Sequence, residues 1–131
     1  MALTNYDFLQ VGEPGASPWL GGIDADDYDG DFVKAAASVP GVTALSPNYG
    51  FPQNGTIADP VFRFYPDRKM INDARRRGLK VIPWTCDDPG TIAALMDIGI
   101  DGIITNYPDR VRDIMADRGM RLPTAYPAPR H

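Results

Sequence analysis

Acidic side chains are the most concentrated chemical groups in the first part of the chain. Five aspartates lie close together: Asp24, Asp26, Asp27, Asp29 and Asp31. Carboxylates at this density suit a hard cation such as calcium. The spacing is not that of an EF-hand, because a loop starting at Asp24 has Tyr28 at its fifth position and one starting at Asp27 has Phe32 where glycine is required. We therefore expect a solvated loop whose last aspartates cap a helix that begins near Asp31.

Groups for proton transfer or thiol chemistry are scarce. The only histidine is His131, the last residue of a Pro-rich tail, and the only cysteine is Cys86. A single cysteine excludes an internal disulfide and a Cys-rich metal site. We assign no catalytic residue and no metal ligand to this chain.

Side chains able to contact a ligand directly follow two apolar runs. Trp84, Thr85 and Asp87 come after one run, and Asn106 comes after the next. Each also has a structural interpretation. Trp84 can pack as an ordinary aromatic, Thr85 can close the strand end, Asp87 can be a solvated turn residue, and Asn106 can cap the following helix. These four are the candidate substrate-binding residues, and for Asn106 we favour the capping role.

Composition limits the classes of protein to consider. The chain has 131 residues, 44% hydrophobic and 23% charged, which is typical of a soluble globular domain. No apolar run approaches the roughly 18 residues of a membrane helix, and the N-terminus does not resemble a signal peptide. A net charge of −4 without a basic stripe argues against nucleic acid and anionic membranes as partners. The cellular compartment is left open.

The elements that would position these side chains repeat one unit, in which an apolar strand is followed by a turn and an amphipathic helix. Predicted strands cover Ala2–Tyr6, Val42–Ser46, Leu79–Thr85 and Ile100–Thr105. Predicted helices cover residues 31–38, 70–78, 89–99 and 108–119. This alternation indicates an α/β fold with parallel strands. Pro83 predicts an irregularity, since it cannot donate a ladder hydrogen bond. The domain is expected over residues 1–119, followed by a Pro-rich tail over 120–131.

Unequal connections indicate which end of the sheet binds ligands. The turns at Gly78 and Gly99 are short, whereas residues 7–29 and 48–66 form long strand-to-helix connections. Long connections of this kind lie at the C-terminal ends of parallel strands, where α/β proteins bind ligands. Arg75–Arg77 end a helix and so belong to the opposite end. Aromatic residues gather in the second long connection, where we favour anchoring of the loop over lining of a cleft: Tyr49, Phe51, Phe62, Phe64 and Tyr65.

Two stretches carry a resemblance to a known family. Val81–Asp87 reads VIPWTCD and Ala94–Asp109 reads ALMDIGIDGIITNYPD. They resemble the last two strand-helix units of glycerophosphodiester phosphodiesterases, in which a Trp-Thr pair ends the seventh barrel strand and G-[VI]-D-G-I-I-T-D-x-P forms the eighth. The similarity is dense over residues 68–119 and weaker over residues 2–66. It implies the C-terminal half, about strands five to eight, of a TIM (β/α)8 barrel.

The resemblance also implies a reaction. Members of the family hydrolyse glycerophosphodiesters to glycerol 3-phosphate and an alcohol, with a divalent cation (calcium or magnesium) held by carboxylates and with two histidines as acid and base. The motifs that supply these groups belong to the first half of the barrel and are absent here. The resemblance therefore implies a fragment without a cofactor site, inactive alone, in which Trp84 walls the substrate pocket. Asn106 stands where the family usually has aspartate.

A second interpretation does not involve catalysis. A half-barrel leaves parallel strand edges unpaired, and such edges are adhesive. The chain could hide them by dimerising or by docking on another protein. The residues do not decide between the two interpretations.

Overall fold

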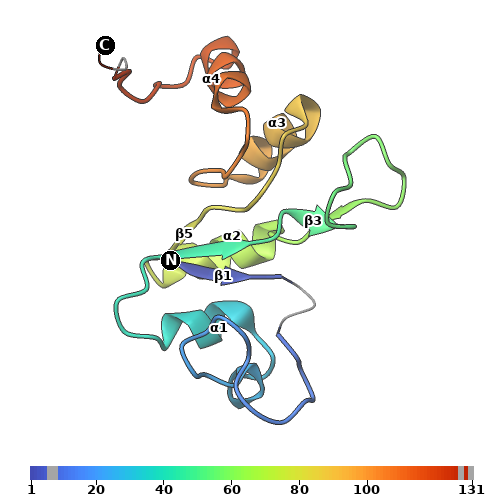
Figure 1. Ribbon diagram of the computed structural model, residues 1–131, viewed down its shortest axis with the longest axis vertical. Coiled ribbons are helices and arrows are strands. Elements are labelled where there is room, and N and C mark those ends of the chain that lie inside the picture. The colour runs from blue at the N-terminus through green and yellow to red at the C-terminus, as the bar shows by residue number, and fades with distance from the viewer. Residues whose placement is uncertain (6–8, 127–128, 130–131) are drawn as a thin grey trace.

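A parallel sheet forms the centre of the protein. The computed structural model describes residues 1–5, 9–126 and 129. Strands β1 (Ala2–Thr4), β2 (Ala44–Pro47) and β5 (Lys80–Val81) make one sheet in the order β1-β2-β5, and both pairs are parallel (Figure 1). The prediction of an α/β fold with parallel strands is confirmed. The parallel pairing of the strands expected near residues 42–46 and 80–85 is confirmed too.

Most of the helices begin where the sequence places capping side chains. They are the 3-10 helix η1 (Ala25–Tyr28) and the α-helices α1 (Phe32–Ala37), α2 (Arg68–Arg76), α3 (Pro89–Ile98) and α4 (Pro108–Asp117). Asp31, Asp67 and Asp88 each accept a hydrogen bond from a backbone N–H in the first turn that follows. Helix α3 ends at Gly99, whose positive φ of 104° suits glycine.

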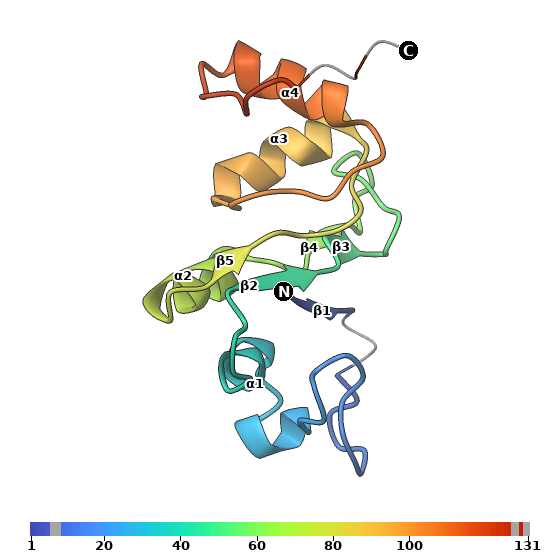
Figure 2. The ribbon, with the colours of Figure 1, turned by 60° about the vertical axis from the view of Figure 1, so that its left-hand side comes forward.

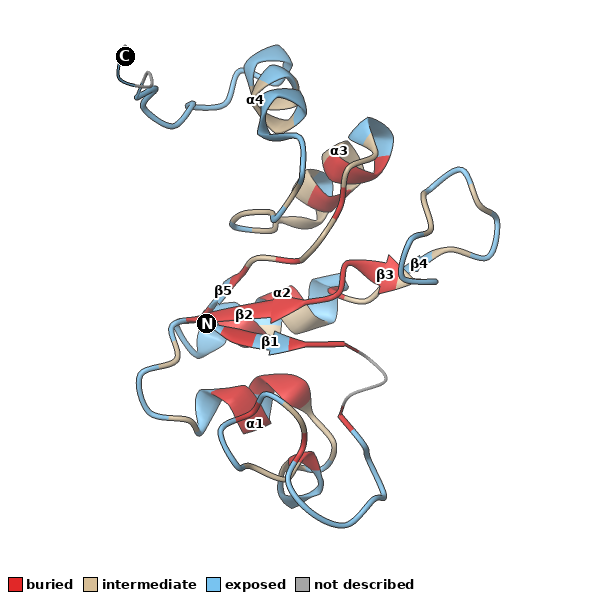
Figure 3. Ribbon diagram, in the orientation of Figure 1, coloured by how far each residue is buried: buried red, intermediate tan, exposed pale blue. Residues whose placement is uncertain are grey.

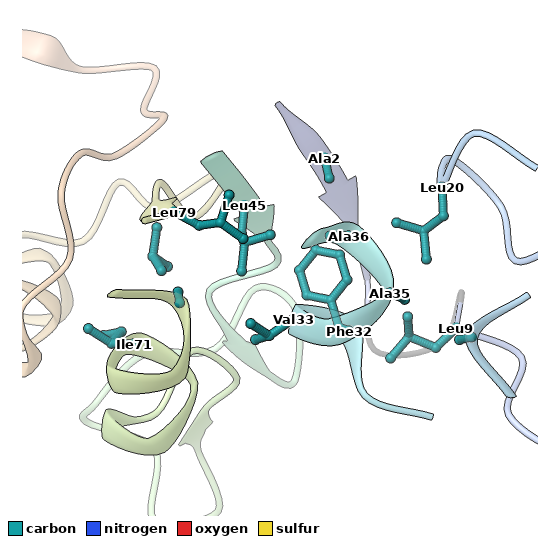
Figure 4. Close-up of a cluster of buried hydrophobic side chains, with 13 residues drawn as sticks. Ala2, Leu9, Leu20, Phe32, Val33, Ala35, Ala36, Leu45, Ile71 and Leu79 are labelled. Carbon is teal, nitrogen blue, oxygen red and sulfur yellow. The ribbon is translucent and has the colours of Figure 1, made fainter. Parts of the chain in front are cut away.

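The main core lies on one face of the sheet. Ala2, Leu45 and Val81 are buried register neighbours on β1, β2 and β5, so their side chains share that face. Helices α1 and α2 cover it with Phe32 and Ile71 among others (Figure 4). Figure 3 shows the result as buried strands and buried inner turns of α1. The opposite face of the sheet carries the alternate residues, among them Leu3, which is exposed, and Ser46, which is buried.

A second, smaller core holds the C-terminal helices together. Cys86, Ile92 and Leu95 are buried there, and Ile103 and Val111 pack against them. Figure 2 shows α3 and α4 stacked beyond β5, on the far side of the sheet from α1. Ile100 packs against both cores and links them.

The expected strand Ile100–Thr105 is wrong as a strand, although the segment does run beside β5. Asp101 N donates to Val81 O at 2.9 Å and Ile104 N donates to Pro83 O at 2.9 Å. A step of two residues along the β5 segment, from Val81 to Pro83, therefore corresponds to a step of three in its neighbour, from Asp101 to Ile104. The register slips by one residue. Pro83 has no N–H to donate at this point, and Val81 N donates to Asp101 Oδ2 at 2.9 Å instead of to a main-chain carbonyl. The predicted irregularity at Pro83 is confirmed, and it reaches into the neighbouring segment.

The long connection after β2 contains a hairpin that the sequence did not predict. Strands β3 (Gly50–Phe51) and β4 (Arg63–Phe64) pair antiparallel. Tyr49, Phe62 and Phe64 form successive ring contacts, with centroids 5.9 and 5.1 Å apart, and belong to the second core. The preference for anchoring over lining a cleft is confirmed for Tyr49 and Phe62, whereas Phe51, Phe64 and Tyr65 line a cavity beside the hairpin.

The C-terminal tail has no helix or strand over residues 120–126. Arg112 Nη1 in α4 donates to Pro123 O at 2.9 Å and holds its beginning. The domain boundary at residue 119 stays a prediction. Three residues that the predictions also used lie outside the described residues: Tyr6, Asp7 and His131. In the part of the chain that is described, no helix is long and apolar enough to cross a membrane.

Candidate functional site

A row of polar and aromatic side chains crosses the sheet at the C-terminal ends of its strands. Thr4 is paired with Pro47, and the next residues along, Asn5 and Asn48, continue that register through the bond from Asn48 N to Thr4 O at 2.9 Å. Asn48 in turn forms a parallel bridge with Trp84. Alternation along the strands places this row on the face opposite Leu45 and the main core.

The asparagines of this row are buried and bonded to each other. Asn5 is 5% exposed and Asn48 is fully buried. Asn48 Oδ1 accepts from Gly50 N at 3.0 Å, and Asn48 Nδ2 donates to Asn5 Oδ1 at 3.4 Å. Asn5 Nδ2 donates to Gln53 Oε1 in the hairpin turn at 3.3 Å. Each buried amide thus has at least one partner in a different segment of the chain.

Trp84 lies at the end of this row. Its Nε1 donates to Ser46 O at 2.9 Å, and its backbone N donates to Pro47 O at 3.0 Å. The indole N–H is committed to β2, so only the aromatic ring of this half-buried residue is available to a ligand. Thr85 follows it and is also half-buried.

Asp87 ties the strand-end segment after β5 to the segment before α4. Its carboxylate accepts from Thr105 Oγ1 at 2.7 Å, from Asn106 N at 2.8 Å and from Asn106 Nδ2 at 2.9 Å. The bond from the Asn106 side chain, together with those from the Asn106 backbone and Thr105, holds the pKa of Asp87 below its usual range. Asp87 is therefore more than a solvated turn residue. We call Asp87, Thr105 and Asn106 the clasp.

Arg110 reinforces the clasp from α4. Its Nη1 donates to Asp87 O at 3.1 Å, and its guanidinium carbon lies 3.8 Å from the centroid of the Tyr107 ring. The side chain of Asn106 does not cap α4. The N-cap residue is Tyr107, which makes no capping side-chain bond, so the capping prediction for Asn106 is wrong. Asn106 donates to Asp87 instead, which an aspartate at this position could do only when protonated.

Comparison with known proteins places this geometry in a family. The model of the glycerophosphoryl diester phosphodiesterase family matches residues 2–110. The chain belongs to this family. The resemblance inferred from VIPWTCD and GIDGIITNYP is confirmed, and the match reaches into the N-terminal part, where the sequence signal was weak.

Curated relatives of the family span more than this chain. A putative glycerophosphodiester phosphodiesterase, YhdW, of Bacillus subtilis is 34% identical over 86 residues, which cover 60% of this chain and 35% of the relative. A probable glycerophosphodiester phosphodiesterase 2 of Mycobacterium tuberculosis is 40% identical over 55 residues, 38% of this chain and 21% of the relative. A dermonecrotic toxin of Loxosceles aff. spinulosa is 50% identical over 38 residues, 29% of this chain and 14% of the toxin. The chain thus spans about a third or less of these relatives.

A solved structure shares the fold. The putative glycerophosphoryl diester phosphodiesterase from Silicibacter pomeroyi DSS-3 superposes with a TM-score of 0.57 and 23% identity, over 90% of this chain and 30% of that one. At this identity the likeness is evidence for the fold alone. It agrees with the parallel strands and flanking helices described above.

The resemblance implies a divalent cation, but the described residues are not arranged to hold one. The described residues contain no group of three or more His, Cys, Asp or Glu side chains placed to hold a metal ion. Asp31 caps α1, so the predicted capping role of the last aspartates is confirmed for this residue; Asp24 instead caps η1, and Asp26 accepts from Gly12 N at 2.9 Å. Asp87 already accepts three hydrogen bonds at its two oxygens.

Two further side chains that could take part in a reaction have structural roles instead. Cys86 is 1% exposed, and burial raises the pKa of its thiol to about 12, so it is not a nucleophilic thiolate at neutral pH. Burial raises the pKa of Tyr49 to about 12 as well, and its hydroxyl donates to Gly55 O. Arg75 Nη2 donates to Gly99 O at 2.8 Å at the other end of the sheet, as its position in the last turn of α2 predicted.

The residues that sequence reasoning missed are Asn5, Asn48 and Gln53. The available signal was that Asn5 and Asn48 each follow an apolar strand directly, as Trp84 does. A cavity of about 470 Å³ lies elsewhere, between α1, the hairpin and α2, and none of the four predicted residues lines it. The sheet-end row and the clasp lie outside that cavity.

Proposed function

We propose that this chain forms strands five to eight of a glycerophosphodiester phosphodiesterase barrel and contributes the substrate-positioning side of its site. β1, β2, β5 and the segment 100–105 take the places of those strands. The observation that carries the proposal is the family match over residues 2–110 together with the row Asn5, Asn48 and Trp84 at the C-terminal ends of the strands.

The complete enzyme would hydrolyse a glycerophosphodiester to glycerol 3-phosphate and an alcohol. Within that reaction this chain's residues bind and orient. The Trp84 ring walls the glycerol or alcohol group, and the clasp fixes the strand ends on which Thr85 and Asn106 meet the ligand. Neutral amides and an engaged carboxylate cannot move a proton at neutral pH. The cation and the histidines that the family uses must come from outside this chain.

The chain alone is therefore expected to be inactive. A single acid-base group contributes roughly 10²- to 10⁴-fold to a rate, and without such a group and a cation little acceleration of diester hydrolysis remains. Purified chain should leave glycerophosphocholine intact with magnesium or calcium, as followed by an enzymatic assay for glycerol 3-phosphate. Chelator-sensitive release that scales with the concentration of the chain would overturn the proposal.

A chimera tests the positive half of the proposal. Fusing the N-terminal part of the Bacillus subtilis relative to this chain should give metal-dependent turnover. In that chimera, Trp84→Ala should lower kcat/KM by about tenfold or more while lowering the melting temperature little. Trp84→Phe keeps a ring but removes the bond to Ser46 O, so it should retain most turnover. Unchanged turnover with a large loss of stability in Trp84→Ala would assign the residue to packing.

A non-catalytic role through self-association is the second candidate. Leu3 on β1 is 38% exposed on the open face of the sheet, and within the described residues β1 pairs with β2 alone. Sedimentation analysis should then show a dimer that Leu3→Lys dissociates. Val61→Lys changes an exposed hairpin-loop residue that is 71% exposed and serves as the matched control. A monomeric wild-type chain would exclude this role.

A further inference from the structure

The amides of Gly50, Asn48, Asn5 and Gln53 form one directed chain of hydrogen bonds. A backbone N–H can only donate, so the bond from Gly50 N fixes the oxygen of Asn48 toward Gly50. The Asn48 amino group must then face Asn5, whose oxygen accepts it. The Asn5 amino group is left to face Gln53, whose oxygen accepts it. One backbone donor thus sets the orientation of all three side chains, which we call the amide relay.

The relay ends in a free pair of donors at the ligand-binding end of the sheet. Because Gln53 uses its oxygen on Asn5, its Nε2 amino group points away from the relay. Gln53 is exposed, whereas Asn5 and Asn48 are buried. Gln53 Nε2 donates no hydrogen bond to any other described residue. Successive hydrogen bonds in a poorly solvated chain polarise one another, which makes the last donor stronger than an isolated glutamine.

We propose that Gln53 is a ligand-binding residue whose Nε2 donates to an anionic phosphate oxygen, and that Asn5 and Asn48 are positioning residues that keep this donor turned outward. The choice of a phosphodiester as the source of that oxygen rests on the function proposed above. The donor itself rests on the relay. Two buried amides are costly unless every group is paired, and here the pairing produces an outward N–H rather than an outward oxygen.

The direction of the relay distinguishes this role from simple closure of the hairpin. Asn5→Asp keeps the oxygen that accepts from Asn48 but removes the donor to Gln53. Gln53 must then rotate and donate to Asp at position 5, which leaves its oxygen facing the ligand. Closure of the hairpin is preserved, while the outward donor is lost without any change at Gln53.

The experiment uses the whole 131-residue chain. Side-chain amide resonances in ¹H–¹⁵N spectra are followed while glycerophosphocholine, inorganic phosphate or glycerol is added in separate titrations. The Gln53 amino resonances should shift and saturate with both phosphate probes, and glycerol should leave them unchanged. Gln53→Met and Gln53→Glu alter an exposed position and lack the reporting amide, so their binding is read from backbone resonances of the hairpin; each should weaken binding by about tenfold, the loss of one charge-assisted bond.

Two more variants complete the test. Asn5→Asp should also weaken binding by about tenfold, although residue 53 is still glutamine. Asn54→Asp introduces the same charge at the neighbouring exposed residue outside the relay, and should bind like the wild type. Asn5→Asp binding as tightly as the wild type, or Asn54→Asp weakening it equally, would overturn the proposal.

The outcome can be separated from that of the proposed function. Turnover by the chimera together with unmoved Gln53 resonances would reject the amide relay as a binding device and keep the enzyme assignment. Saturating shifts with inorganic phosphate, in a chimera that never turns over glycerophosphodiesters, would keep the Gln53 donor and reject the enzyme assignment. Glycerol shifting the Gln53 resonances while the phosphate probes do not would overturn the anion preference.

Discussion

The two segments that flank β5 pair with it through different kinds of hydrogen bond. On the β2 side, main-chain hydrogen bonds in register continue from Lys80 to the bridge at Trp84. On the other side, the segment 100–105 follows β5 with a slipped register, and the carboxylates of Asp101 and Asp87 bond at its beginning and end. Side chains thus complete the pairing where Pro83 interrupts the ladder.

This difference shows where the fold depends on individual residues. A regular ladder distributes its stability over backbone groups that every residue has, and mutation affects it mainly through packing. A pairing completed by two carboxylates depends on those two residues and on their protonation. The β1-β2-β5 sheet should therefore respond most to changes in core volume, and the C-terminal part to single polar substitutions and to pH.

The largest expected effect is in the main core. Leu45 is fully buried, so Leu45→Ala should reduce the free energy of unfolding by about 2–5 kcal/mol. Ile103 is half-buried in the second core, and Ile103→Ala should cost about 1 kcal/mol. Urea denaturation measures both. Hydrogen exchange should show loss of protection across the whole chain for the first variant and mainly in α3 and α4 for the second; equal, global losses would show that the two cores unfold as one.

Asp101 gives the next largest effect. Its Oδ2 accepts from Val81 N, and Val81 is buried, so Asp101→Ala leaves that N–H without its acceptor and should cost about 1–3 kcal/mol. Asp101→Asn retains an oxygen in the same place and is the matched control. Thermal unfolding of both variants measures the difference in stability. A stability of Asp101→Ala equal to that of Asp101→Asn would mean that the slipped pairing does not need the side chain.

Much of the fold could be predicted from local signals. Asp31, Asp88 and Gly99 mark helix ends by rules that involve only a few neighbouring residues, and the helices appear where those rules place them. The failure at residues 100–105 has a non-local cause. An apolar run there is typical of a buried strand, but its pairing was decided by Pro83 and by an Asp101 side chain replacing a carbonyl. The β3–β4 hairpin was missed because each strand has two residues and the aromatic packing of Tyr49, Phe62 and Phe64 holds it.

The candidate site was also predicted only in part, because local signals do not show which residues meet in the fold. Position after an apolar run and the family resemblance together singled out Trp84, Asp87 and Asn106, and the structure engages the last two in one clasp. The partners of a side chain could not be predicted, and so the role of Asn106 was wrong. Asn5 and Gln53 are 48 positions apart in sequence, and only the fold shows that their amides meet.

Acid should weaken the clasp before it weakens the sheet. The folded-state pKa of Asp87 lies below its unfolded value of roughly 3.9. Its contribution to stability is therefore present above roughly pH 4 and is lost as the pH falls through the folded-state pKa. Asp87→Asn should cost about 1 kcal/mol at neutral pH, a modest figure because the carboxylate is partly exposed, and nothing at low pH. Asp113→Asn, on the exposed side of α4, is the control; a cost for Asp87→Asn that does not change with pH would contradict the assignment.

The smallest expected effect distinguishes charge from hydrogen bonding at Asn106. Asn106→Asp removes the Nδ2 donor and sets a second carboxylate against Asp87, whereas Asn106→Ala removes the donor alone. Both variants keep the Asn106 backbone and Thr105 bonds to Asp87, so each should cost only about 0.5 kcal/mol at neutral pH. The costs should separate as the pH falls. Two facing carboxylates share a proton readily, and a protonated Asp at position 106 regains a donor to Asp87, so the cost of Asn106→Asp should vanish at a higher pH than Asp87 itself needs to titrate. The cost of Asn106→Ala should instead fall only when Asp87 is protonated. Denaturation midpoints measured from pH 7 downward, at low and high salt, would show this as two curves that diverge; superimposable curves would mean that Asn106 contributes to the clasp through its backbone alone.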